Sequence, residues 1–136
     1  MVFACGCKIL PGRQCYSVDA TGWSGEQTPL KAGTSIIEYD GNGIHDTTAI
    51  DLVVQVLDLD SGHPVAGVAA QISGHETFTG STTNTLGSVG FIAFFNGGGN
   101  FDLEIIHPEY ACLRIKNLLF GSGQIVRLNI KLKKRG

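Results

Sequence analysis

The sequence has little charge and no long apolar run, and each shortage removes a class of protein. Charged residues make up 16% of the 136 positions and the formal net charge is −2, so the charge balance gives no reason to expect nucleic-acid binding. No stretch approaches the ~20 apolar residues of a spanning helix, and the N-terminus lacks a signal peptide's long apolar core. The sequence therefore predicts a soluble chain, or one that has lost its targeting segment.

Helical periodicity is also absent, and period-two alternation takes its place from about residue 50 onward. Apolar residues make up 43% of the chain, enough for one core, and many of the nineteen glycines fall in pairs and triplets beside apolar runs, as in a turn-rich all-β protein. Strand-like segments lie near residues 50–56, 66–72, 76–81, 91–95, 101–105, 111–115 and 126–132. These segments predict a seven-stranded Greek-key β-sandwich of the prealbumin or immunoglobulin type.

Two parts of the chain differ in character. Residues 1–48 are rich in glycine and turn residues, and they predict an irregular N-terminal arm with one or two short strands. Residues 49–136 form the predicted sandwich. Within it, the unbroken apolar run Phe91 to Phe95 predicts a strand that is buried on both faces.

The segment Leu52 to Val68 is the most specific feature of the chain, because it reads as a strand, a tight turn and a return strand. It resembles the opening of the carboxypeptidase regulatory-like domains, which have a prealbumin-like (transthyretin-like) fold. Further pieces of that resemblance follow in order: TTNTLG at 82–87 with Gly90-Phe91, GNFDL at 99–103, HPEY at 107–110 and the strand at 123–133. The resemblance covers roughly residues 50–133 and implies a scaffold that is usually non-catalytic.

The same opening also resembles the hydroxyisourate hydrolases, which are catalytic relatives of transthyretin. Those enzymes have a His in the first strand, an Arg in a later hairpin and a closing Tyr-Arg-Gly-Ser. This chain has Gln55 and Ser88 at the first two positions and ends in LKKRG. The comparison therefore predicts no catalytic residues of that kind.

Other catalytic and metal-binding patterns are missing as well. No G-x-S-x-G is present, and His45, His63, His75 and His107 form neither HxxE nor HxxxH, so we expect them in solvent-exposed turns and rims. Asp40 to Gly43 with Asp46 begins like a calcium loop but lacks the glutamate at position twelve, and a glycine-rich turn is the favoured interpretation. We expect no enzyme activity, metal or cofactor.

The four cysteines leave several interpretations open: Cys5, Cys7, Cys15 and Cys112. In an oxidising compartment they allow three pairings, and Cys112 either pairs with a cysteine of the arm or remains a surface thiol. The first three offer thiolate ligands for zinc, but no CxxC or nearby His supports such a site. Alternatively, Val2 to Cys5 is the remnant of a bacterial lipoprotein cleavage site with a lipidated Cys5, the only expected membrane contact.

Three aromatic residues of the arm are candidates for partner contact: Tyr16, Trp23 and Tyr39. Trp23 either plugs the open end of the sandwich or contacts a partner.

Together these features predict a non-catalytic β-sandwich module for protein–protein interaction, adhesion or assembly at the bacterial cell envelope. Its expected location is extracellular, periplasmic or outer-membrane-associated, with a protein partner or a second copy of itself. One alternative is a carbohydrate- or small-ligand-binding accessory domain. A transthyretin-like hydrolase is a second alternative, which the missing catalytic residues disfavour.

Overall fold

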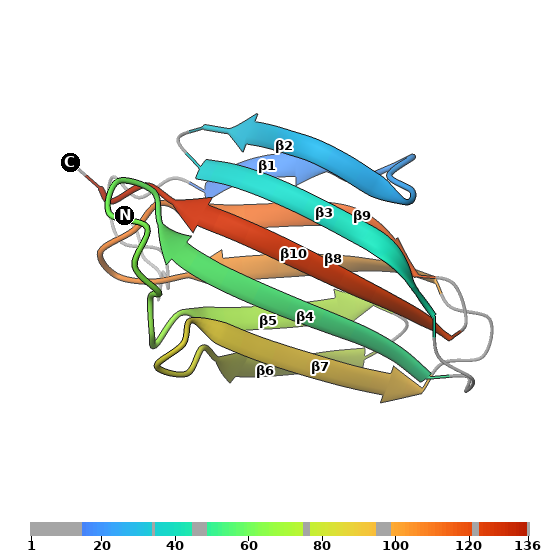
Figure 1. Cartoon of the computed structure of the whole chain (residues 1–136). Helices are drawn as coiled ribbons and strands as arrows, with labels where there is room; N and C mark the ends of the chain where they lie inside the picture. The colour runs from blue at the N-terminus through green and yellow to red at the C-terminus, as the bar shows by residue number, and fades with distance from the viewer. Residues whose placement is uncertain are drawn as a thin grey trace, which may run out of the picture.

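The computed structural model describes residues 15–33, 35–44, 49–74, 77–94, 99–120 and 123–135, which form two stacked β-sheets (Figure 1). The strands are β1 (Cys15–Asp19), β2 (Glu26–Ala32), β3 (Ser35–Ile44), β4 (Ala49–Asp58), β5 (Ala69–Gly74), β6 (Thr77–Thr82), β7 (Ser88–Phe94), β8 (Gly99–Ile106), β9 (Cys112–Phe120) and β10 (Gln124–Leu132). Among the described residues there is no helix that is long and apolar enough to cross a membrane.

The two sheets have five strands each, in the orders β1-β9-β8-β5-β6 and β2-β3-β10-β4-β7. Two neighbouring pairs are parallel, β1 with β9 and β4 with β10, and the others are antiparallel. The all-β sandwich prediction is confirmed, and the seven expected segments overlap β4 to β10. The description as a seven-stranded Greek key is not confirmed, because the two sheets contain three further strands.

The three further strands come from residues 15–44, where an irregular arm was expected. β1 adds to the edge of one sheet, and the β2–β3 hairpin extends the other sheet through pairing of β3 with β10. Residues 40–43, expected as a glycine-rich turn, lie inside β3. A Cβ atom at Gly41 would collide with the Tyr39 hydroxyl, so the glycine here makes room for the tyrosine instead of forming a turn.

The core lies between the sheets and is built from the alternating apolar positions. Val54, Val56, Leu103, Leu128 and Ile130 are completely buried, and each lies on the inward face of its strand. At about 25 cal/mol per Å² of apolar surface, burial of this kind is the main contribution to folding.

The strand predicted from the apolar run Phe91 to Phe95 is present as β7, and it lies at a sheet edge. Among the described strands, β7 pairs with β4 only, and Gly90 in its middle is exposed. Apolar content predicts a strand but does not determine how many neighbours the strand has.

A disulfide between Cys15 and Cys112 ties β1 to the rest of the fold. The two residues begin β1 and β9, lie opposite each other in the parallel ladder with their Cα atoms 4.3 Å apart, and are separated by 97 positions in the sequence. Pairing of Cys112 with a cysteine of the first segment is therefore confirmed. Cys112 is 1% exposed and is not a surface thiol. Cys5 and Cys7, with the lipidation and zinc interpretations, lie outside the described residues.

We expect loss of this disulfide to destabilise the chain strongly, because the bond closes a loop of about a hundred residues. Replacement of Cys15 and Cys112 by serine should lower the free energy of unfolding by about 2–5 kcal/mol, measured by urea denaturation. The matched control replaces Cys5 and Cys7 by serine and should leave the free energy of unfolding nearly unchanged. A non-reduced peptide map without a Cys15–Cys112 peptide would contradict the assignment.

Candidate functional site

A buried hydrogen-bond cluster joins the turn after β4 to the segment before β9. One oxygen of Asp58, Oδ1, accepts the backbone N–H groups of Asp60 and Ser61, each at 2.9 Å. The other oxygen, Oδ2, accepts the Tyr110 hydroxyl at 2.6 Å. Asp58 is 7% exposed and Tyr110 is 5% exposed. A carboxylate at the end of a strand thus holds both its own turn and a tyrosine 52 positions away.

The electrostatics of this cluster are those of a structural pair. Hydrogen bonds from Tyr110 and the turn N–H groups favour the charged carboxylate and lower the pKa of Asp58 to about 2. Burial and the hydrogen bond to Asp58 raise the pKa of Tyr110 to about 12. A general acid or base works best with a pKa near the working pH, and both groups are shifted away from neutrality. The hydrogen bonds of this cluster hold the turn after β4 against the segment before β9.

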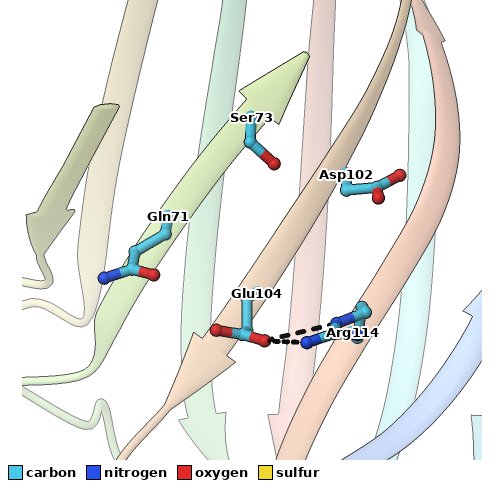
Figure 2. Close-up of a pocket in the computed structure, with 5 residues that line it drawn as sticks. All are labelled: Gln71, Ser73, Asp102, Glu104 and Arg114. Carbon is cyan, nitrogen blue, oxygen red and sulfur yellow. Dashed lines mark hydrogen bonds and ion pairs between the residues drawn. The ribbon is translucent and has the colours of Figure 1, made fainter. Parts of the chain in front are cut away.

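A polar depression of about 300 Å³ lies on the outer face of the β1-β9-β8-β5-β6 sheet (Figure 2). Gln71 and Ser73 come from β5, Asp102 and Glu104 from β8, and Arg114 from β9. The ladder register brings them together, since Gln71 lies opposite Glu104 and Glu104 lies opposite Arg114. All five residues are polar and none is aromatic, so the depression offers hydrogen bonds and charge to a ligand without a stacking surface.

Two of these charged residues largely neutralise each other. Arg114 donates to Glu104 Oε2 from Nη2 at 2.5 Å and from Nε at 3.2 Å. The hydrogen bond to Glu104 raises the pKa of Arg114 further. Asp102 accepts the backbone N–H of Asn117 at 3.2 Å, next to an irregularity in the β8–β9 register. The face is therefore polar, partly paired and open to solvent.

The depression is not evident from the sequence. Asp102 and Glu104 alternate with apolar residues in one predicted strand, and Arg114 does so in the next. Only the register of three strands shows that they meet, and alternation within a single strand carries no register information across the sheet.

The three candidate aromatic residues contact their own chain. The rings of Trp23 and Tyr39 lie 5.3 Å apart between centroids and are tilted by 55°. Tyr39 is 2% exposed, and its role as a partner contact stays a prediction. Trp23 and Tyr16 are partly buried against the core, and the Tyr16 ring occupies the space in which a side chain at Gly33 would lie.

The histidines and acidic residues that the sequence singled out do not converge where they are described. His63 is exposed in the turn after β4, and His107 Nδ1 accepts the N–H of Glu109 at 3.1 Å. His45, Asp46 and His75 lie outside the described residues. Within the described ranges, no three His, Cys, Asp or Glu residues form a group that could hold a metal ion.

The edge strands on the two sides of the sandwich differ sharply (Figure 1). β1 and β2 form one side, where β1 has only five residues and the disulfide, and β2 has Glu26, Pro29, Lys31 and a register shift. β6 and β7 form the opposite side, which we call the open side. Their sequences, TFTGST and SVGFIAF, contain no charged residue and no proline. Charge, proline and bulges are the usual protection of an edge, and the open side has none of them.

Comparison with known proteins identifies a fold and no family. No family model matches the chain, and no curated protein matches it. The 3-chlorocatechol 1,2-dioxygenase of Rhodococcus opacus 1CP is similar with a TM-score of 0.50 and 8% identity, over 67% of this chain and 62% of the enzyme. The dioxygenase domain of a carbohydrate-binding fusion protein from Streptomyces sp. SirexAA-E gives a TM-score of 0.46 and 11% identity, over 65% and 82%. This chain spans less than two thirds of the first enzyme, and that likeness shows a shared fold alone.

We expect the Tyr110→Phe substitution to lower the melting temperature by roughly 5–10 °C at neutral pH, because it removes the donor to a buried carboxylate oxygen. The pKa of Asp58 is lower in the folded state than its ordinary 3.8, so its contribution is complete above about pH 3.8 and is lost as the pH falls toward about 2. The difference between wild type and variant should shrink in that range.

The pKa of Tyr110 is raised in the folded state, so its contribution is complete below about pH 10 and is lost as the pH rises through about 12. Thermal melts from pH 2 to pH 12 test both limits. Tyr16→Phe is the matched control, and a loss at Tyr110 that is independent of pH would contradict the assignment.

Proposed function

We propose that this chain is a non-catalytic β-sandwich module that joins other proteins, or copies of itself, in adhesion or assembly. The observation that supports this proposal is the open side, formed by β6 and β7. β6 and β7 are the edge strands of the two sheets on the side opposite β1 and β2. Among the described strands neither has a neighbour on its outer edge, and neither contains protecting charge or proline. Addition of a strand to such an edge is a general mode of protein recognition.

We also propose that residues 50–133 form a Greek-key sandwich of the carboxypeptidase regulatory-like kind. The pieces of that resemblance contact one another, which supports the proposal. Asp58 in the first piece accepts the hydroxyl of Tyr110 in the HPEY piece. Thr83, in the second piece, donates its hydroxyl to the carbonyl of Val65 at 2.7 Å and accepts the N–H of Val68 at 3.0 Å. The motif residues thus form one connected end of the sandwich.

A location outside the cytosol fits the Cys15–Cys112 disulfide, because such bonds persist in oxidising compartments. We propose the bacterial cell envelope, with the chain periplasmic, extracellular or associated with the outer membrane. The likeness to dioxygenases extends to the fold only, so it transfers no activity to this chain.

The polar depression supports a second candidate, a carbohydrate- or small-ligand-binding accessory domain. Its five side chains offer donors and acceptors suited to a polar ligand. Sugar sites usually also provide an aromatic platform, and none lines this depression. We therefore rank ligand binding below strand addition.

A pair of charged variants separates the candidates. Lysines at Gly80 and Gly90 introduce charge on the open side, one in β6 and one in β7. The matched control introduces lysines at Ser17 and Thr28, exposed positions of β1 and β2 on the protected side. We expect the open-side variant to lose association, measured by light scattering after size exclusion, and the control to retain it.

Hydrogen exchange of β6 and β7, with and without a purified envelope fraction, detects a foreign partner. Protection of these strands that the open-side variant loses supports the proposal. An unassociated chain without such protection would refute it. Glycan binding that Glu104→Gln with Arg114→Gln abolishes, and the open-side variant keeps, would establish the second candidate instead.

A further inference from the structure

The outward backbone groups of β7 form a short open row. Val56 N–H donates to the Gly87 carbonyl at 2.7 Å, so the next residue, Ser88, points its groups away from β4. There Asn84 covers them, through its Oδ1 at 3.1 Å and its N–H at 3.0 Å. The alternation of an antiparallel ladder then directs the N–H and C=O groups of Gly90, Ile92 and Phe94 outward. Among the described strands, β7 pairs only with β4, so no strand there pairs with these groups.

Gly90 lies in the centre of β7, where neither the backbone conformation nor the available space requires a glycine. Its φ is not positive, and a Cβ atom there would meet only the Leu52 carbonyl oxygen at 3.8 Å, an ordinary contact. A glycine costs strand stability, and in a strand it often marks a close approach of another backbone or ligand. Val53, directly opposite on β4, is 37% exposed as a result. The outer face therefore has an apolar notch formed by Val53 and the missing side chain of Gly90.

β7 itself has the sequence that would fill this notch. The open row Gly90, Ile92 and Phe94 is centred on Ile92, and all three positions share one face by the two-residue period. Antiparallel pairing of two β7 strands about Ile92 sets Ile92 against Ile92 and Phe94 of one copy against Gly90 of the other. Large apolar residues, aromatic ones above all, are favoured neighbours of an edge glycine. The absence of charge in β7 means that self-pairing opposes no like charges.

We propose that two copies of this chain associate through β7, antiparallel and with a two-fold axis at Ile92, so that the β2-β3-β10-β4-β7 sheet continues across the dimer. This inference rests on the proposed function and names the partner for the open side. The continuous apolar run of β7 then acquires a neighbour on its second edge.

A cysteine at position 92 tests the register directly. Residues paired across an antiparallel ladder have Cα atoms about 5.5 Å apart, within the range of a disulfide. In full-length chain with Cys5→Ser and Cys7→Ser, Ile92→Cys should form a covalent dimer of twice 14.4 kDa under mild oxidation. Thr28→Cys on the protected side is the matched control and should remain monomeric. The Cys15–Cys112 peptide, mapped in each variant, verifies the native fold.

Charge at the same position provides the second measurement. Ile92→Lys places two like charges opposite each other and should weaken association about tenfold or more, measured by sedimentation equilibrium, while Thr28→Lys should not. A wild-type chain that stays monomeric, or a dimer that Ile92→Cys fails to cross-link, would overturn this interface. If β6 and β7 are then still protected by the envelope fraction, the proposed function stands with a different partner. If they are not, both proposals fail.

Discussion

Unpaired strand edges are the constraint on which the rest of this structure depends. Two open five-stranded sheets have four edges, and each exposes backbone N–H and C=O groups that must be covered, solvated or paired with another chain. The features that protect a strand edge are concentrated on the side of β1 and β2. They are the disulfide at Cys15, the proline and charges of β2, and the Tyr16 ring over Gly33. Among the described residues, the other side has the Asn84 cap at the first residue of β7. Folding alone would favour protection on both sides, so the asymmetry is a property of the surface that requires a functional explanation.

The Asp58–Tyr110 hydrogen-bond cluster at one end of the sandwich connects the two sides. Asp58 fixes the turn after β4 and, through Tyr110, the approach to β9, so the same cluster orients one strand from each sheet. β4 is the neighbour of β7, and β9 is the neighbour of β1. A single buried carboxylate therefore links the strand that supports the open side to the strand that supports the protected side. Its lowered pKa is a consequence of the hydrogen bonds that it accepts in that role.

The sequence predicted the strands of residues 49–132 well, because alternation there is strong and turn residues separate the segments. For residues 15–44 it predicted only one or two short strands, because glycine and proline usually indicate loops, and the structure has three strands there. Gly41 in fact accommodates Tyr39, and Pro29 lies on an edge strand where its missing N–H is not needed. The Cys15–Cys112 pairing was one of the open alternatives, and only the parallel register of β1 with β9 selects it. The sequence could not predict the polar depression for the same reason, since its residues become neighbours only through the register of three strands.

The sequence of β7 and its position in the sheet disagree. Its continuous apolar run is typical of a strand inside a sheet, yet among the described strands β7 has a neighbour on one edge only. Local sequence and global fold normally agree, and disagreements concentrate at functional sites. Val53, which lies opposite Gly90, is exposed although it is apolar. A residue with a side chain at position 90 would cover Val53 without strain. Both conflicts disappear when a second strand lies against β7. The sequence of β7 is therefore that of an interior strand, and we infer that the sheet is complete only in the assembled protein.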